Sequence, residues 1–179
     1  VDTEYVIKTR SDEYFSSFDC IVEKFLENTE KMVCGNIFFQ KFKIQPFHIG
    51  DHIFVAKTKY ILNAVKAIKD TYEGKMQPEW WSRQGPFAAE QVLAHAFLQA
   101  KGITLKEYIN PAYHAGLHIM EPRFADENIN IFKNNFDLVD LNEVENFVLS
   151  WKHGMKTYRN VFQNPHGVAS MSDCLEGIG

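Results

Sequence analysis

A basic residue, a hydroxyl and an acid follow one another at Arg10, Ser11 and Asp12, directly after a predicted strand at residues 4–9. An aspartate at the carboxyl end of a strand is well placed to bind Mg²⁺ or Mn²⁺, because these cations take oxygen ligands and are often completed by substrate phosphates. Arginine binds phosphate through paired N–H groups, so Arg10 beside Asp12 suits a metal–diphosphate complex. The alternative is structural, with Ser11 and Asp12 capping the helix that follows.

Two further carboxylates are candidate site residues. Asp51 lies between Gly50 and His52 before a predicted strand, and Glu90 lies near the amino end of a predicted helix. Open α/β sheets bind ligands beyond the carboxyl ends of their strands, where loops supply such side chains. For Glu90 the alternative is a favourable charge at the positive end of the helix dipole.

Histidines recur at a spacing that suggests a metal site. His48 and His52 form one i, i+4 pair, and His114 and His118 form another. On a helix this spacing would place both imidazoles on one face. Prolines and glycines near both pairs argue against such helices, so solvated loop histidines are the alternative. We expect His95, which is surrounded by apolar residues, to be a satisfied core histidine.

An adjacent pair of tryptophans, Trp80 and Trp81, lies in a loop bounded by glycine and proline. An indole ring can stack on the apolar face of a sugar, so the pair is a candidate platform for a saccharide. The alternative is that both rings are half-buried anchors of the loop. The sequence contains no GxSxG, GxGxxG or glycine-rich phosphate-loop motif.

Composition narrows the class of protein. The chain has 179 residues, a 45% hydrophobic share and a net charge of −4, which indicate one globular domain and no broad nucleic-acid interface. The most apolar windows are too short for a transmembrane segment. Cys20, Cys34 and Cys174 are odd in number and lack CxxC spacing, which favours reduced thiols and a cytoplasmic location.

The order of apolar patterns predicts an α/β fold, with a mixed sheet flanked by helices. Strands are expected at residues 4–9, 32–39 and 52–56, and residues 129–141 are expected to hold a strand pair or a single strand with a turn at Asn134 and Asn135. Helices are expected from Ser16 or Ser17 to about residue 30, and at 57–72, 86–101 and 143–153, with Gly102 ending the third. We expect a single catalytic-type domain at residues 1–163 and a loosely structured tail at 164–179.

The sequence resembles the carboxyl-terminal portion of the WavE-like glycosyltransferases of lipopolysaccharide synthesis. The resemblance extends over residues 5–152 and rests on the stretches EYVIKTRSDEYF, KMVCGNIFF, PFHIGDHIFVAKTKYIL, AAEQVLAHAFL and FDLVDLNEVENFVLSWK. In that family a strand ends in a basic-x-Asp element, a later Asp precedes a helix, and an acidic element such as Glu-Gln follows in a downstream helix. The amino-terminal half of that family has no counterpart here, which indicates either a portion of a longer protein or a weaker relation to the family.

This resemblance implies a GT-A-type fold, or a fragment of one, and a nucleotide-sugar donor. In such folds an Asp-containing motif at a strand end holds Mn²⁺ or Mg²⁺ on the donor diphosphate. Asp12 is the position that matches, and Arg10 and Ser11 would complete the donor site. Arg10 stands where the familiar Asp-x-Asp motif has its first acid, so it could neutralise the diphosphate directly.

The implied reaction is transfer of the sugar to a saccharide acceptor in surface-glycan synthesis. Asp51 or Glu90 would act as general base on the acceptor hydroxyl, which predicts inversion at the anomeric carbon. Trp80 or Trp81 would position the acceptor. Two other classes stay open, namely a histidine-dependent metal enzyme that uses the two histidine pairs and a noncatalytic carbohydrate-binding domain that uses the tryptophans.

Overall fold

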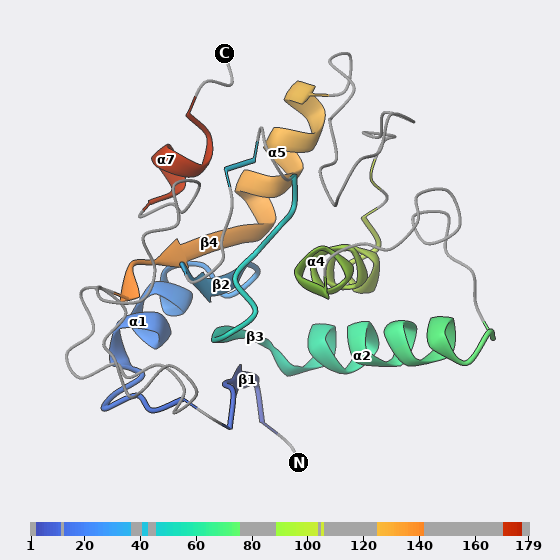
Figure 1. The fold of residues 1–179 in the computed structure, drawn as a ribbon, viewed down its shortest axis with the longest axis horizontal. Coiled ribbons are helices and arrows are strands. Elements are labelled where there is room, and N and C mark those ends of the chain that lie inside the picture. Colours follow the sequence, from blue (N-terminus) through green and yellow to red (C-terminus); the bar gives the residue numbers. More distant parts are fainter. Residues whose placement is uncertain are drawn as a thin grey trace.

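The computed structural model describes residues 3–11, 13–36, 41–42, 46–75, 89–103, 105, 125–141 and 170–176. Within them the chain forms the following elements in order (Figure 1): β1 (Tyr5–Lys8), α1 (Asp19–Glu27), β2 (Met32–Gly35), β3 (Phe54–Lys57), α2 (Thr58–Tyr72), α4 (Ala89–Ala100), α5 (Ala125–Asn135), β4 (Phe136–Val139) and α7 (Met171–Cys174). The predicted α/β class, with a mixed sheet flanked by helices, is confirmed.

In the described residues, four strands form one sheet in the order β1-β3-β2-β4. β3 runs antiparallel to both of its neighbours, with Lys8 of β1 opposite Phe54 and Cys34 of β2 opposite the same residue. β2 and β4 are parallel. The carboxyl ends of β1, β2 and β4 therefore lie at the same edge of the sheet, which is also the edge where β3 begins. We refer to it as the carboxyl edge.

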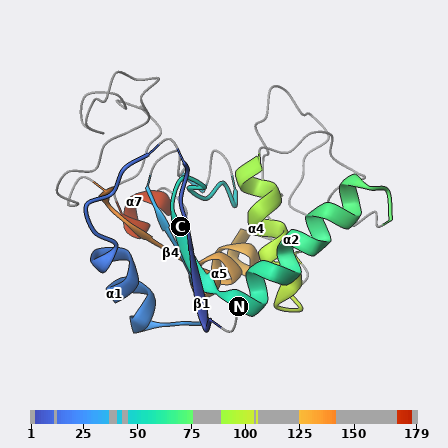
Figure 2. The same cartoon turned by 90° about the horizontal axis from the view of Figure 1, so that it is seen from below.

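Alternating side chains of the strands enter two different cores, as the pleat of a sheet requires. One core contains Met32, Cys34, Phe54, Ala56, Phe136 and Leu138 from the sheet. The other contains Val33, Val55 and Ile53, which meet Ile21 and Phe25 of α1. Figure 2 shows α1 on one side of the sheet and α2, α4 and α5 on the other. The sheet is thus the middle layer of three.

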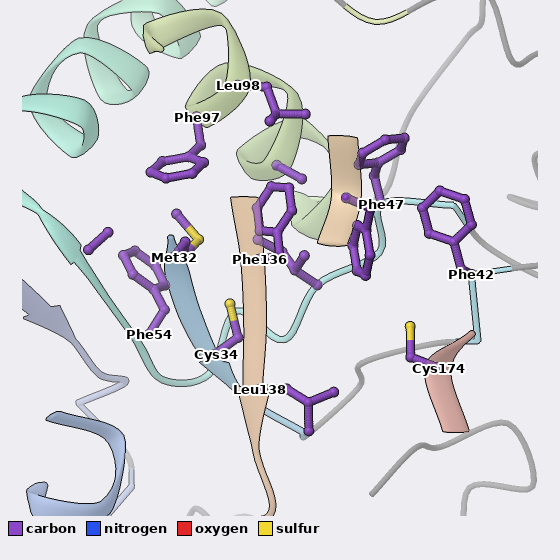
Figure 3. Close-up of a cluster of buried hydrophobic side chains, with 14 of the residues drawn as sticks. Met32, Cys34, Phe42, Phe47, Phe54, Phe97, Leu98, Phe136, Leu138 and Cys174 are labelled. Atoms are coloured by element: carbon purple, nitrogen blue, oxygen red, sulfur yellow. The ribbon is translucent and has the colours of Figure 1, made fainter. Parts of the chain in front are cut away.

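A group of phenylalanines fills the larger core (Figure 3). The ring centroid of Phe47 lies 5.1 Å from that of Phe42, 5.6 Å from that of Phe132 and 6.4 Å from that of Phe136. Phe47 is 0% exposed and has a φ of 59°. A non-glycine residue rarely adopts this left-handed conformation, so the buried ring holds a strained backbone in place.

The ends of the helices test the predicted capping residues. α1 begins at Asp19 with Phe18 as its N-cap, which makes no side-chain capping bond, while the Ser17 hydroxyl accepts from the Asp19 N–H at 3.0 Å. Because α1 begins this late, the interpretation of Ser11 as its cap is wrong. α4 is ended by Gly102, as predicted, and Gly102 has a φ of 76°. The Gly102 N–H donates to the Gln99 carbonyl and the Ile103 N–H donates to the Leu98 carbonyl, both at 2.9 Å, which together form a Schellman motif.

Two predicted segments differ from the structure. Residues 129–135 belong to α5 rather than to a strand, and β4 starts directly at Phe136. The acids Asp126 and Glu127 in the first turn of α5 and Lys133 in its last turn complement the helix dipole. In the expected tail, residues 171–174 form α7 instead of coil, and its Cys174 is buried in the larger core. The helix expected at 143–153 lies outside the described residues.

Polar side chains join the elements at the edge of the sheet opposite the carboxyl edge. The Glu30 carboxylate accepts from the Lys57 ammonium and, at 2.7 Å, from the Tyr60 hydroxyl, and these bonds lower the pKa of Glu30 to about 2. The Lys101 ammonium donates to the Glu30 carbonyl at 2.6 Å and to the Asn135 side chain at 2.5 Å. These contacts connect the start of β2, the end of β3, the end of α4 and the end of α5.

Within the described part of the chain, none of the helices is both long enough and apolar enough to span a bilayer.

Candidate functional site

The carboxyl edge brings together two chain segments that are far apart in sequence. Because Lys8 pairs with Phe54, the residues after β1 and the residues before β3 run side by side. The Lys8 ammonium donates to the Asp51 carbonyl and lies 3.9 Å from the Asp51 carboxylate. The side chains of Lys8 and Asp51 are 35% and 27% exposed, so this ion pair is accessible to a ligand.

A buried carboxylate connects the same two segments a second time. The chain turns after β1, with the Glu13 N–H donating to the Arg10 carbonyl at 3.4 Å. One Glu13 side-chain oxygen, Oε1, lies 3.7 Å from Arg10 Nε and also contacts His52 Nδ1. The Glu13 side chain is 0% exposed, whereas the Arg10 side chain is 41% exposed. The arginine is thus a surface cation with a buried anchor.

The amino end of α4 attaches to the segment that precedes β3. His48 Nε2 lies 3.7 Å from a carboxylate oxygen of Glu90. The side-chain amide of Gln91 donates to the Pro46 carbonyl at 2.9 Å. The stretch of chain at residues 46–52, which contains Asp51, is thus also the stretch to which Glu90 of α4 is attached.

The neighbouring strands complete the edge with neutral and acidic groups. The Asn36 amide nitrogen, just past β2, donates to Asp140 Oδ1 at 2.8 Å, just past β4. The Asn36 side-chain oxygen in turn accepts from the Leu141 N–H at 3.1 Å. Asn36 is 2% exposed, so its amide fixes the two strand ends relative to each other.

The structure brings together part of the predicted site. Arg10 and Asp51 lie at the carboxyl edge on adjacent segments, and Glu90 is attached to the second of these through His48. Ser11 is exposed in the turn that follows β1. The predicted metal ligand Asp12 and the predicted acceptor residues Trp80 and Trp81 lie outside the described residues.

For the first histidine pair, the interpretation as solvated loop histidines is wrong. His48 and His52 are 8% and 7% exposed, so they are not solvated loop histidines. Each contacts a different carboxylate, Glu90 for His48 and Glu13 for His52. His114 and His118 lie outside the described residues. His95 is a core histidine as expected, 3% exposed and with its ring 5.8 Å from that of Phe47.

Three site residues were missed by the sequence analysis, namely Lys8, Glu13 and His48 as a partner of Glu90. A signal for Lys8 was present, because Lys8 and Arg10 are two residues apart at the end of a strand and such residues share a face. No local signal identifies Glu13, since its partner His52 is 39 residues away and is brought close only by the register of β1 and β3.

Chemically, the described site offers two cations, Lys8 and Arg10, beside a half-buried carboxylate, Asp51. The described residues include no group of three or more His, Cys, Asp or Glu side chains placed to hold a metal ion. Lysine and arginine at a strand end bind phosphate oxygens directly, and a carboxylate within reach of a substrate hydroxyl accepts its proton.

Comparisons of the chain with models of protein families, with curated proteins and with solved structures found no match.

Proposed function

We propose that this chain carries catalytic residues of a glycosyltransferase that moves a sugar from a nucleotide-sugar donor to a saccharide acceptor. The observation that carries the proposal is that three separate sequence stretches are joined, through Lys8 with Asp51 at the carboxyl edge of the sheet and through His48 with Glu90 in the chain that leads to that edge. The carboxyl edge of an α/β sheet is the usual place for a ligand site. These three are among the five stretches that carry the resemblance to the WavE-like, GT-A-type family of lipopolysaccharide synthesis.

In the proposed reaction the donor diphosphate binds beside Lys8 and Arg10. A general base takes the proton of an acceptor hydroxyl, and the hydroxyl oxygen forms a bond to the anomeric carbon. The bond from that carbon to the diphosphate oxygen breaks on the opposite side, which inverts the configuration. Lys8 and Arg10 stabilise the negative charge that develops on the departing nucleoside diphosphate.

Two carboxylates compete for the role of base, and the described geometry gives each a distinct environment. Asp51 is next to the Lys8 ammonium, on the side where the donor diphosphate would bind. Glu90 is 19% exposed and next to a buried imidazole. Asp51→Asn and Glu90→Gln decide between them. The variant that removes the base lowers kcat by about 10²- to 10⁴-fold, whereas the other variant retains most of the wild-type kcat.

A divalent ion is a separate part of the proposal. We propose that Asp12 holds Mn²⁺ or Mg²⁺ on the donor diphosphate. The interpretation of the Ser11–Asp12 pair as the cap of α1 loses its basis, since that helix has Phe18 as its N-cap. Among the described residues, Lys8 and Arg10 are the ones proposed to stabilise the negative charge of the diphosphate.

The proposal is tested by product analysis with a panel of nucleotide sugars. We expect the full chain to release the nucleoside diphosphate from one donor, and to do so faster when a saccharide acceptor is present. Arg10→Ala should weaken donor binding, because it removes a cation from the diphosphate site. Release of no diphosphate from any donor, combined with sugar binding in the absence of nucleotide, would instead support the noncatalytic carbohydrate-binding alternative.

A further inference from the structure

Glu13, in the turn after β1, has a fully buried carboxylate of which only one oxygen is paired within the described part of the chain. Its side chain is 0% exposed, and its Oε1 atom contacts both Arg10 and His52. Its other oxygen, Oε2, is buried and has no hydrogen-bond partner among the described residues. Removing a carboxylate from water is costly unless the charge is fully paired. A buried carboxylate with an unsatisfied oxygen is thus unfavourable for the stability of the fold, and such groups concentrate at functional sites.

The two partners of Glu13 belong to the two halves of the candidate site. Arg10 follows β1, where the donor diphosphate is proposed to bind. His52 follows Asp51, one of the two candidate bases. A single side chain therefore sets the position of the guanidinium and of the residue next to the carboxylate. Substitution of Glu13 would release both at once.

We propose that Glu13 is a positioning residue of the donor site, which holds the Arg10 guanidinium in place for the diphosphate and fixes His52 beside Asp51. This inference rests on the proposed function. Glu13 acts through Arg10, since its own oxygens are buried and an acid would repel a phosphate. Arginine gains affinity for phosphate when its planar group is held in one orientation, because less conformational freedom is then lost on binding.

The first test measures nucleoside diphosphate binding by titration calorimetry, with uridine, guanosine, cytidine and adenosine diphosphate as probes. Glu13→Gln keeps the shape of the side chain and removes its charge. We expect its Kd for the diphosphate that the wild type binds to be weaker by about tenfold, the size typical of a charge-assisted contact. Glu13→Asp keeps the buried charge but shortens the side chain, so it provides the same test if Glu13→Gln does not fold.

Glu30→Gln is the matched control. Glu30 also accepts from two side chains, but it lies at the opposite edge of the sheet. We expect it to lower the thermal unfolding midpoint, Tm, while leaving the Kd unchanged. A purely structural role for Glu13 predicts the same pattern for Glu13→Gln, so comparing Kd with Tm separates the two roles.

A double-mutant cycle tests whether Glu13 acts through Arg10. In an Arg10→Ala background, Glu13→Gln should change the Kd by less than twofold, because the residue that it positions is gone. The inference is overturned if Glu13→Gln binds diphosphate as the wild type does, or if its effect is equally large without Arg10. If the wild type binds none of the four probes, the proposed function itself fails, which is a distinct result.

Discussion

Phe47 allows a sharp test of how the strained segment before the site is held. It lies between Pro46, whose carbonyl accepts from Gln91, and His48, which contacts Glu90. Its φ of 59° is in the left-handed region, and its ring is fully buried among other phenylalanines (Figure 3). We infer that the ring compensates for the backbone strain.

The size of two substitutions follows from these observations. Phe47→Ala removes a fully buried ring, which costs about 3–5 kcal/mol of unfolding free energy. Phe47→Gly loses the same ring, but glycine avoids the penalty of about 1–2 kcal/mol that other residues have in the left-handed region. Glycine also has more conformational entropy to lose on folding, worth about 0.5–1 kcal/mol. The glycine variant should therefore be the more stable by about 0.5–1 kcal/mol, in contrast to the usual order.

Phe132 is the matched control for this comparison. It is 1% exposed in the same cluster, but it lies inside α5, where the backbone is helical. In a helix interior, glycine is less favourable than alanine by about 1 kcal/mol, so Phe132→Gly should be less stable than Phe132→Ala. Urea unfolding of the four variants measures both differences. An alanine variant at position 47 that is as stable as the glycine variant, or more so, would refute the inference of strain.

Three further predictions concern stability and reactivity. The pKa of Glu30 is lowered from 4.5 to about 2 by its lysine and tyrosine partners. The extra stability of the wild type over Glu30→Gln should thus be constant above about pH 5 and decline as the pH falls to about 2, as measured by urea unfolding. Burial raises the pKa of the fully buried Cys34, while Cys20 is only partly buried. We therefore expect iodoacetamide to label Cys20 before Cys34 in the folded protein, as measured by mass spectrometry, and equal labelling of the two would refute this order. Gly35→Ala would place a Cβ atom 2.6 Å from Leu141 Cδ1, so we expect a loss of about 1–3 kcal/mol in unfolding free energy; an unchanged value would show that Leu141 moves aside freely.

The elements that were predicted correctly have strong local signals. α2 follows a clear helical period, and α4 ends at a glycine with the positive φ that its Schellman motif requires. β1 and β3 have apolar runs bounded by polar residues, and their positions were found to within two residues. In these segments local preference and tertiary packing favour the same structure.

α5 shows where local signals fail. Its residues Asn128, Ile129, Asn130 and Ile131 alternate between polar and apolar, which imitates the period of a strand. In the structure the buried positions are 128, 129, 132 and 135, a spacing of three to four that is typical of a helix. Two asparagines among the buried positions conceal this period, because asparagine is counted as polar when only the sequence is known.

The candidate site was predictable only in part for a related reason. Arg10, Asp51 and Glu90 could be recognised as candidates because they are charged residues next to predicted strands and helices. The residues that hold them do not, since the contacts of Glu13 with His52 and of His48 with Glu90 join segments about 40 residues apart. Those contacts depend on the register of β1 with β3 and on the attachment of α4, neither of which is encoded locally.

The measurement that tests the central claim most directly is a thermal-shift screen of nucleotide sugars, with and without Mn²⁺, on the wild type and on Arg10→Ala and Asp12→Asn. A ligand at a hundred times its Kd adds about 2.7 kcal/mol to the free energy of unfolding, which is readily detected. We predict that one nucleotide sugar raises the Tm of the wild type, that Mn²⁺ increases the shift, that Arg10→Ala reduces it and that Asp12→Asn abolishes the part due to Mn²⁺. A shift of equal size in Arg10→Ala, or no shift with any nucleotide sugar, would contradict a donor site at the carboxyl end of β1.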